Sequence, residues 1–86
     1  MDNKVVVTLY DHMKNTKTDL ELDLDISALE LFNGLNEAYQ WGIDASDIQN
    51  SYLSMENPIA LLRGNRKLSE FGVRDGSVIH YIRHGS

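Results

Sequence analysis

The strongest constraint on the fold is a strict alternation of apolar and acidic residues over residues 18–26. The apolar positions are Leu20, Leu22, Leu24 and Ile26, and the acidic positions between them are Asp19, Glu21, Asp23 and Asp25. Successive side chains of a strand point to opposite faces, so this pattern predicts a half-buried antiparallel strand. We therefore expect a sheet with one face on a core and an outer face that is acidic along this strand.

A helix is predicted directly after this strand. Ser27 and Glu30 have the spacing of a capping box, in which each side chain bonds a backbone N–H of the other residue. An apolar stripe with spacings of three and four follows, made of Ala28, Leu31, Phe32, Leu35, Ala38, Tyr39 and Gly42. We expect Gly42 to end the helix as a C-cap, and Gly34 to permit close packing of the helix on the sheet.

The remaining apolar segments predict four further strands. They comprise residues 4–10, 51–55, 59–62 and 78–83. Polar and glycine-containing stretches between them predict turns, and the loop over residues 11–17 should join the first two strands as a hairpin. The sequence thus predicts an α+β fold with a mixed sheet of four to five strands on one main α-helix, in a single domain over residues 1–86.

Composition narrows the function classes. The 86 residues include no cysteine, so disulfides, thiolate nucleophiles and cysteine zinc sites are excluded, and a cytoplasmic location is expected. The net charge of -5 argues against nucleic acid as a ligand, because such binding needs a positive surface. No apolar segment is long enough for a signal peptide or a bilayer span, so direct membrane insertion is not expected.

The charges are unevenly distributed along the chain. From Asp19 to Asp47 there are eight carboxylates and no lysine or arginine, whereas cations outnumber carboxylates from Arg63 onward. This polarity could orient a protein partner, or it could simply keep the domain soluble.

Catalytic and metal-binding patterns find no support. His80 and His84 have a spacing that suits a metal only on a helix; on a strand they lie about 13 Å apart, too far for one zinc ion. Ser27 is explained as an N-cap, which leaves His12 and Asp11 without a nucleophile. We expect no enzyme activity, no metal and no cofactor.

A resemblance rests chiefly on residues 67–82, where a Leu-x-x-Phe-Gly-Val segment is followed by the Asp75-Gly76 turn and a closing apolar strand. This pattern resembles the end of a ubiquitin-like β-grasp domain. With residues 5–10 and 19–22, the chain resembles the YukD/EsaB group of bacterial ubiquitin-like proteins, which are encoded with type VII (ESX/WXG100) secretion systems. The resemblance implies an accessory protein that binds membrane-anchored or ATPase subunits of that system in the cytoplasm.

Two other functions remain as alternatives. A ubiquitin-like modifier or sulfur carrier needs a flexible tail ending in Gly-Gly, but this sequence ends Arg83-His84-Gly85-Ser86, which extends only about 13 Å. We therefore expect no conjugation. A self-assembling module, with a weak homodimer that joins the acidic strand to the basic last third, is the other alternative.

Two surfaces are candidates for protein binding. The first comprises Val6, Thr8, Val78, His80, Ile82 and Arg83, which should lie on the open sheet face if Ile79 and Tyr81 point inward. By resemblance it corresponds to the apolar patch through which ubiquitin is recognised; ordinary scattered surface hydrophobicity is the alternative explanation. The second comprises Asp19, Glu21 and Asp23, whose charges could instead serve to prevent sheet-to-sheet aggregation. The lone Trp41 is expected to pack in the core or at its rim.

Overall fold

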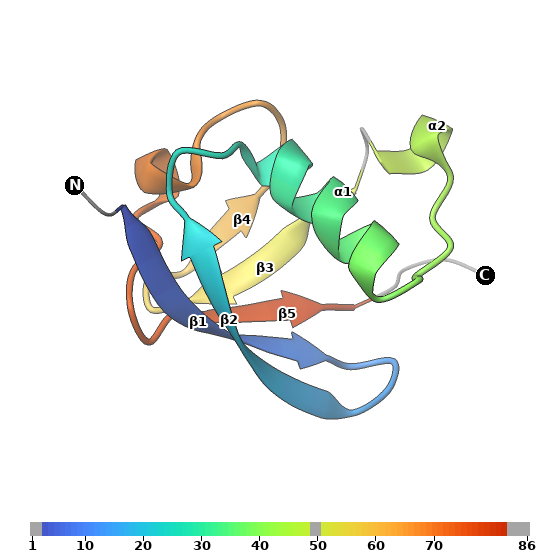
Figure 1. The fold of residues 1–86 in the computed structure, drawn as a ribbon, viewed down its shortest axis with the longest axis horizontal. Coiled ribbons are helices and arrows are strands. Elements are labelled where there is room, and N and C mark those ends of the chain that lie inside the picture. The colour runs from blue at the N-terminus through green and yellow to red at the C-terminus, as the bar shows by residue number, and fades with distance from the viewer. Residues whose placement is uncertain (1–2, 49–50, 83–86) are drawn as a thin grey trace.

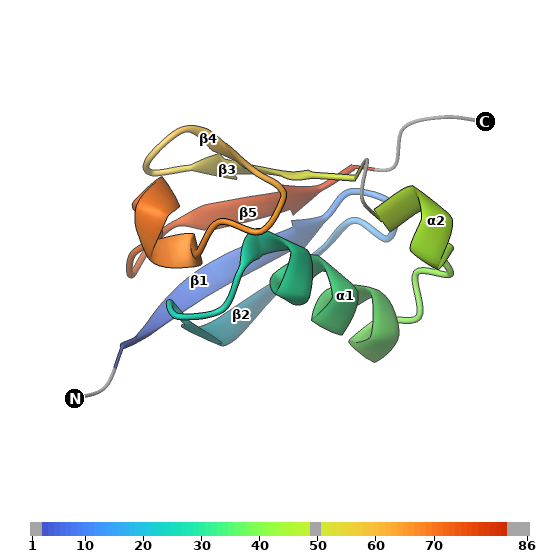
Figure 2. The same ribbon diagram turned by 90° about the horizontal axis from the view of Figure 1, so that it is seen from above.

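The computed structural model describes residues 3–48 and 51–82. In chain order its elements are β1 (Lys4–Asp11), β2 (Thr16–Asp23), α1 (Ala28–Ala38), α2 (Ala45–Ile48), β3 (Leu53–Glu56), β4 (Ala60–Leu62), the 3-10 turn η1 (Leu68–Phe71) and β5 (Val78–Tyr81). Figures 1 and 2 show α1 lying across one face of a twisted sheet, whose other face carries no helix of the described chain.

The sheet is mixed and its strands follow the order β2-β1-β5-β3-β4. β1 runs antiparallel to β2 and parallel to β5, and β5 runs antiparallel to β3. The last strand of the chain therefore lies in the middle of the sheet, while β2 and β4 are the two edges. The predicted α+β class, with five strands in the described residues and one main helix, is confirmed.

Alternation along the strands builds the core. Val7, Leu9, Ile79 and Tyr81 point toward α1 and are buried. The helix contributes a matching stripe of buried residues, namely Ala28, Leu31, Phe32 and Leu35. The core cluster also contains Leu22, Trp41, Leu53, Met55, Leu62, Leu68 and Val73. The inward orientation expected for Ile79 and Tyr81 is confirmed, as is the packing role of Trp41.

The start of α1 satisfies its free backbone donors within the protein. The Glu30 N–H donates to Ser27 Oγ at 3.0 Å and the Ser27 N–H donates to Glu30 Oε1 at 3.1 Å, which confirms the predicted capping box. The Ala28 and Leu29 N–H groups donate to carbonyls of the loop that precedes η1, each at 2.9 Å. The helix is thereby fixed to the last third of the chain at its first turn.

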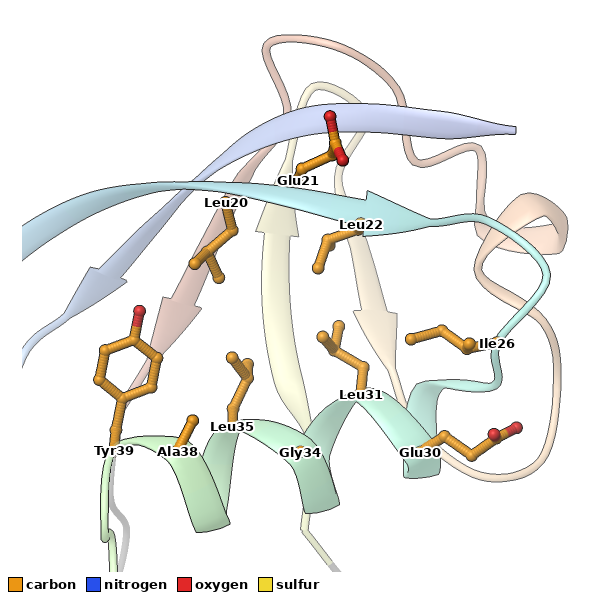
Figure 3. Close-up of a pocket in the computed structure, with 10 residues that line it drawn as sticks. All are labelled: Leu20, Glu21, Leu22, Ile26, Glu30, Leu31, Gly34, Leu35, Ala38 and Tyr39. Carbon is orange, nitrogen blue, oxygen red and sulfur yellow. The ribbon is translucent and has the colours of Figure 1, made fainter. Parts of the chain in front are cut away.

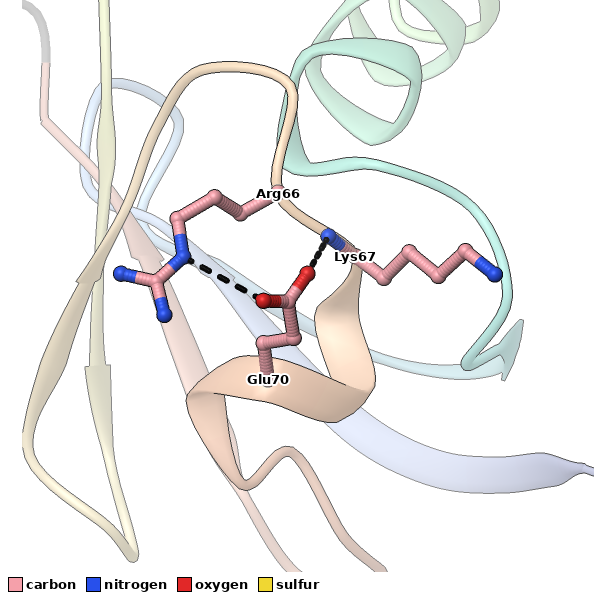
Figure 4. Close-up of polar contacts among 3 residues, drawn as sticks. All are labelled: Arg66, Lys67 and Glu70. Carbon is pink, nitrogen blue, oxygen red and sulfur yellow. Dashed lines mark hydrogen bonds and ion pairs between the residues drawn. The ribbon is translucent and has the colours of Figure 1, made fainter.

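A glutamate organises the turn that receives this contact. Glu70 Oε2 accepts a hydrogen bond from the Lys67 N–H at 3.0 Å, and Glu70 Oε1 lies 3.6 Å from Arg66 Nε (Figure 4). Both donors precede Glu70 by one turn, so the contacts stabilise η1 locally. Buried Leu68 and Val73 then close one end of the core.

The end of α1 differs from the expectation. The helix ends at Ala38, with Tyr39 as its C-cap, and Gly42 lies in the following loop at φ 72°. Asn36 explains the early end, because its side-chain amide bonds both the N–H and the carbonyl of Ile43 at 3.0 Å and folds the chain back. The connection that follows contains the short helix α2, which the sequence pattern did not indicate.

Two further expectations are corrected. The alternation over residues 18–26 is a strand only as far as Asp23, whose side chain accepts the Asp25 N–H and begins a turn. Gly34 does not mediate close packing, because a Cβ placed there would meet no atom within 4 Å. The space beside Gly34 is therefore open.

A buried carboxylate fixes the far end of the sheet. Asp11 is 4% exposed; one of its oxygens accepts the N–H groups of Met13 and Lys14, and the other accepts the indole N–H of Trp41 at 3.3 Å. The Trp41 ring stacks on Tyr81 with centroids 3.6 Å apart. Asp11 thus joins the hairpin turn to the loop after α1, and Trp41 joins that loop to β5.

We predict that Asp11→Ala lowers the free energy of unfolding by roughly 2–3 kcal/mol, because it leaves the buried indole N–H without an acceptor. Urea unfolding measured by tryptophan fluorescence and circular dichroism tests this. Glu37→Ala is the matched control, since Glu37 is exposed on α1, and it should change stability by less than about 0.5 kcal/mol. Equal stability of the two variants would contradict the role of Asp11.

Candidate functional site

The sheet face opposite α1 is built mainly by β1 and β5. Their parallel register places Thr8 beside Val78 and Tyr10 beside His80. Because Val7, Leu9, Ile79 and Tyr81 point into the core, the residues between them point outward. The outward orientation predicted for Val6, Thr8, Val78 and His80 agrees with this structure.

The acidic residues of β2 join the same face. The antiparallel register places Glu21 opposite Val6 and Asp19 opposite Thr8, whose hydroxyl donates to Asp19 Oδ1 at 3.3 Å. Asp23 follows at the end of β2, opposite Lys4. The two candidate surfaces, which were predicted as separate from the sequence, therefore form one continuous face. This face is acidic along β2 and more apolar toward β5.

The apolar part of this outer face extends across the sheet. Val6 is 48% exposed, Ile82 is 44% exposed, and Leu61 on the edge strand β4 is 52% exposed. Val78 and His80 are only partly exposed because β1 and β3 flank them on either side. Arg83, which the sequence also assigned here, lies outside the described residues.

Two histidines and a tyrosine form a cluster that sequence reasoning missed. His12 Nε2 lies 2.8 Å from His80 Nδ1, so one imidazole donates a hydrogen bond to the other. The His12 ring stacks on Tyr10 with centroids 3.8 Å apart. This contact joins the hairpin turn after β1 to β5, and only the parallel register of these two strands brings the rings together.

His80 carries a second polar contact on its other nitrogen. Its Nε2 atom is buried without a hydrogen-bond partner and lies 3.6 Å from a carboxylate oxygen of Glu56 on β3. Glu56 is itself largely exposed. His80 is therefore positioned between His12 of the hairpin turn after β1 and an acidic side chain of β3, in the middle of the outer face.

The described residues contain no group of three or more histidines, cysteines or acidic residues placed to hold a metal ion. His84, which the sequence considered beside His80, lies outside them. Among the helices of residues 3–48 and 51–82, none combines the length and hydrophobicity that a membrane crossing requires.

Residues 5–80 match the family model described as "WXG100 protein secretion system (Wss), protein YukD". The chain belongs to the YukD family. This match covers most of the sequence and includes β2, α1, β3 and β4, with all but the first residue of β1 and all but the last residue of β5. The predicted relationship to YukD is confirmed, and with it the association of the family with WXG100 secretion.

Solved structures establish the fold of this YukD-family chain. The ubiquitin-like domain of tubulin-binding cofactor B matches with a TM-score of 0.72 at 18% identity, over 93% of this chain and 89% of that one. The C-terminal ubiquitin-like domain of mouse tubulin-specific chaperone e matches with a TM-score of 0.70 at 10% identity, over 99% and 93%. The corresponding domain of Plasmodium falciparum Dsk2 gives 0.61 at 18%, over 90% and 93%.

These similarities confirm the predicted ubiquitin-like β-grasp fold, and at such low identity they show the fold alone. No curated protein matches this YukD-family chain in sequence.

We predict that His80→Glu destabilises the protein by about 1–2 kcal/mol without unfolding it, because it removes the bond to His12 and places a second carboxylate beside Glu56. Urea unfolding at low ionic strength measures the change. His80→Gln is the control that adds no charge. Adding Glu56→Gln to the His80→Glu variant should recover part of the loss, and no recovery would contradict the proximity of these two side chains.

Proposed function

We propose that this protein acts as a non-catalytic ubiquitin-like adaptor of a WXG100 (type VII) secretion system, with residues 1–86 forming a single domain. In this proposal it binds cytoplasmic parts of the membrane complex and is not conjugated to targets. Membership of the YukD family is the observation that carries the proposal. The outer face described above supplies a surface of the kind such a role needs.

The chemistry of that face supports protein binding. It combines exposed Val6, Leu61 and Ile82 with the acidic side chains along β2, and protein interfaces of modest size join apolar and polar groups in this way. The main helix α1 does not cover this outer face, because it packs on the opposite face of the sheet. Binding there would leave the core undisturbed.

The proposed partners are the membrane-anchored and ATPase subunits of the secretion system, met in the cytoplasm. The acidic strand β2 favours a partner with lysine or arginine at the contact, because complementary charge speeds and orients association. The same net charge of -5 disfavours nucleic acid. The proposal includes no direct insertion into the bilayer.

The alternative of self-assembly finds less support in the contacts. Pairing of the acidic strand with the basic last third would use the cations there, and one of them, Arg66, already lies 3.6 Å from Glu70 and 5.6 Å from the Phe71 ring centre. Modification of targets remains an alternative that intact mass can test directly.

The test is capture of the tagged full-length chain from native cytoplasm, with mass spectrometry of the co-purified proteins and of the intact captured chain. We expect secretion-system subunits with an unmodified chain mass. The triple variant Asp19→Lys, Glu21→Lys and Asp23→Lys should recover these subunits at least about tenfold less well at low salt, with a smaller difference at high salt.

The matched control reverses three carboxylates elsewhere, Glu37, Asp44 and Asp47, which are exposed and lie off the outer face. It changes net charge equally and should retain capture. Equal loss in both variants would mean that total charge, not the β2 surface, governs binding. Covalently linked products would overturn the adaptor proposal in favour of a modifier.

A further inference from the structure

A shallow groove lies between β2 and α1, on the core side of the sheet edge. Its volume is about 270 Å³, whereas the share of one water in the liquid is about 30 Å³, so it has room for side chains. The walls are mainly apolar, with Leu20 and Leu22 on β2 facing Leu31 and Leu35 on α1 (Figure 3). Tyr39 lies at one end of the groove, and Ile26 and Glu30 lie at the other.

Gly34 keeps this groove open. It sits between Leu31 and Leu35 on the wall of the groove, is exposed, and has no atom within 4 Å of the place where a Cβ would be. A glycine inside a helix costs roughly 1 kcal/mol relative to alanine. Neither a positive φ nor a close contact requires glycine here. The structural consequence of this glycine is that the groove beside it is not filled by a side chain.

The groove runs beside a strand edge with free backbone groups. The Thr8 N–H donates to the carbonyl of Ser77, directly before β5, and the N–H of His12, directly after β1, donates to the carbonyl of Tyr81 on β5. The backbone groups of the even-numbered residues of β1 therefore face β5, and those of the odd-numbered residues face β2. Their partners Leu20 and Leu22 therefore bond β1. The alternation leaves the N–H and carbonyl groups of Asp19 and Glu21 directed to the open edge, where no described strand pairs with them.

The charges at this edge indicate which kind of peptide strand could pair with β2. A strand added to β2 would point alternate side chains into the groove, beside Leu20 and Leu22, and the others to the outer face, beside Asp19, Glu21 and Asp23. Lys4 offsets part of this charge, because its Nζ lies 3.8 Å from Glu21. Lys17 is a second cation on this face, because it pairs with Tyr10 near the start of β2 and its Nζ lies 5.0 Å from the Tyr10 ring centre. Three carboxylates against two ammonium groups still favour a strand with cations at its outward positions.

We propose that β2 and the groove form a docking site for an extended segment of a partner protein, with apolar residues alternating with lysine or arginine. The segment adds a sixth strand at the β2 edge, fills the space over Gly34 with its apolar side chains, and pairs its cations with the acidic residues of β2. This inference deepens the proposed function, on which it rests for taking a protein as the ligand.

The test uses a capped synthetic peptide, Lys-Val-Lys-Ile-Lys-Val-Lys, titrated into the full chain and followed by NMR of backbone amides. We expect shifts concentrated at Asp19, Glu21 and the α1 residues that line the groove. The block isomer Lys-Lys-Val-Ile-Val-Lys-Lys has the same composition and charge, and it should bind about tenfold more weakly because it lacks the alternation. The acidic analogue with glutamate at the lysine positions should bind still more weakly.

Gly34→Leu is the decisive variant. It fills the groove while replacing glycine by a better helix former, so it should fold at least as stably and bind the alternating peptide at least about tenfold more weakly. Asn33→Leu, on an exposed position of the same helix that does not line the groove, is the matched control and should bind normally. Urea unfolding of both variants verifies that they are folded.

Equal binding of the alternating peptide and its block isomer, shifts confined to Val6, Val78 and His80, or unchanged binding by Gly34→Leu would each overturn the docking site. These results are distinguishable from failure of the proposed function. If Gly34→Leu captures secretion-system subunits as well as the unmodified chain does, the adaptor proposal stands and the groove proposal fails. If the peptide binds the groove but no subunits are captured, the groove proposal stands and the adaptor proposal fails.

Discussion

The structure depends on the insertion of the last strand between the first and the third. β5 pairs in parallel with β1 and antiparallel with β3, and it contributes fully buried Ile79 to the core. Ser77, directly before β5, is also fully buried; its hydroxyl donates to the Asn57 carbonyl and accepts the Arg74 N–H. Without β5 the sheet would divide into two hairpins, β1–β2 and β3–β4, each exposing its apolar face. The outer face also depends on the insertion of β5, because its central residues come from β1 and β5, at opposite ends of the chain.

Local patterns predicted the elements, whereas long-range register had to come from the structure. The alternation in β2 and the capping box of Ser27 and Glu30 act within a few residues, so the sequence specifies them directly. The contact of His12 with His80 requires the parallel register of β1 and β5, which no local pattern encodes. The union of the acidic and apolar surfaces likewise follows from strand pairing. A β-grasp resemblance could place β5 beside β1, but it could not place individual imidazoles within hydrogen-bond distance.

The roles of Gly34 and Gly42 were predicted wrongly because a glycine in a helical pattern can serve several structural purposes. Gly42 lay on the apolar stripe and suited a C-cap, yet the Asn36 side chain ended the helix earlier by bonding Ile43. Gly34 suited close packing, yet its surroundings are open. At Gly42 the deciding contact joins Asn36 to Ile43, which flank the glycine, and at Gly34 it is the absence of contacts within 4 Å. The groove between β2 and α1 was therefore invisible in the sequence, although Leu22, Leu31 and Leu35 of its apolar wall were correctly assigned to inward-facing positions.

The acidic character of β2 has two consequences that follow from one geometry. Two copies of this strand cannot pair edge to edge without placing carboxylates opposite one another, which disfavours self-association. The same carboxylates lower the free energy of a paired strand that carries cations at the facing positions. Protection against self-pairing and selection of a cationic partner are therefore not competing explanations of Asp19, Glu21 and Asp23. The space behind the edge bears on the proposed binding role, because Gly34 leaves it open and a paired strand would have room there for its inward side chains.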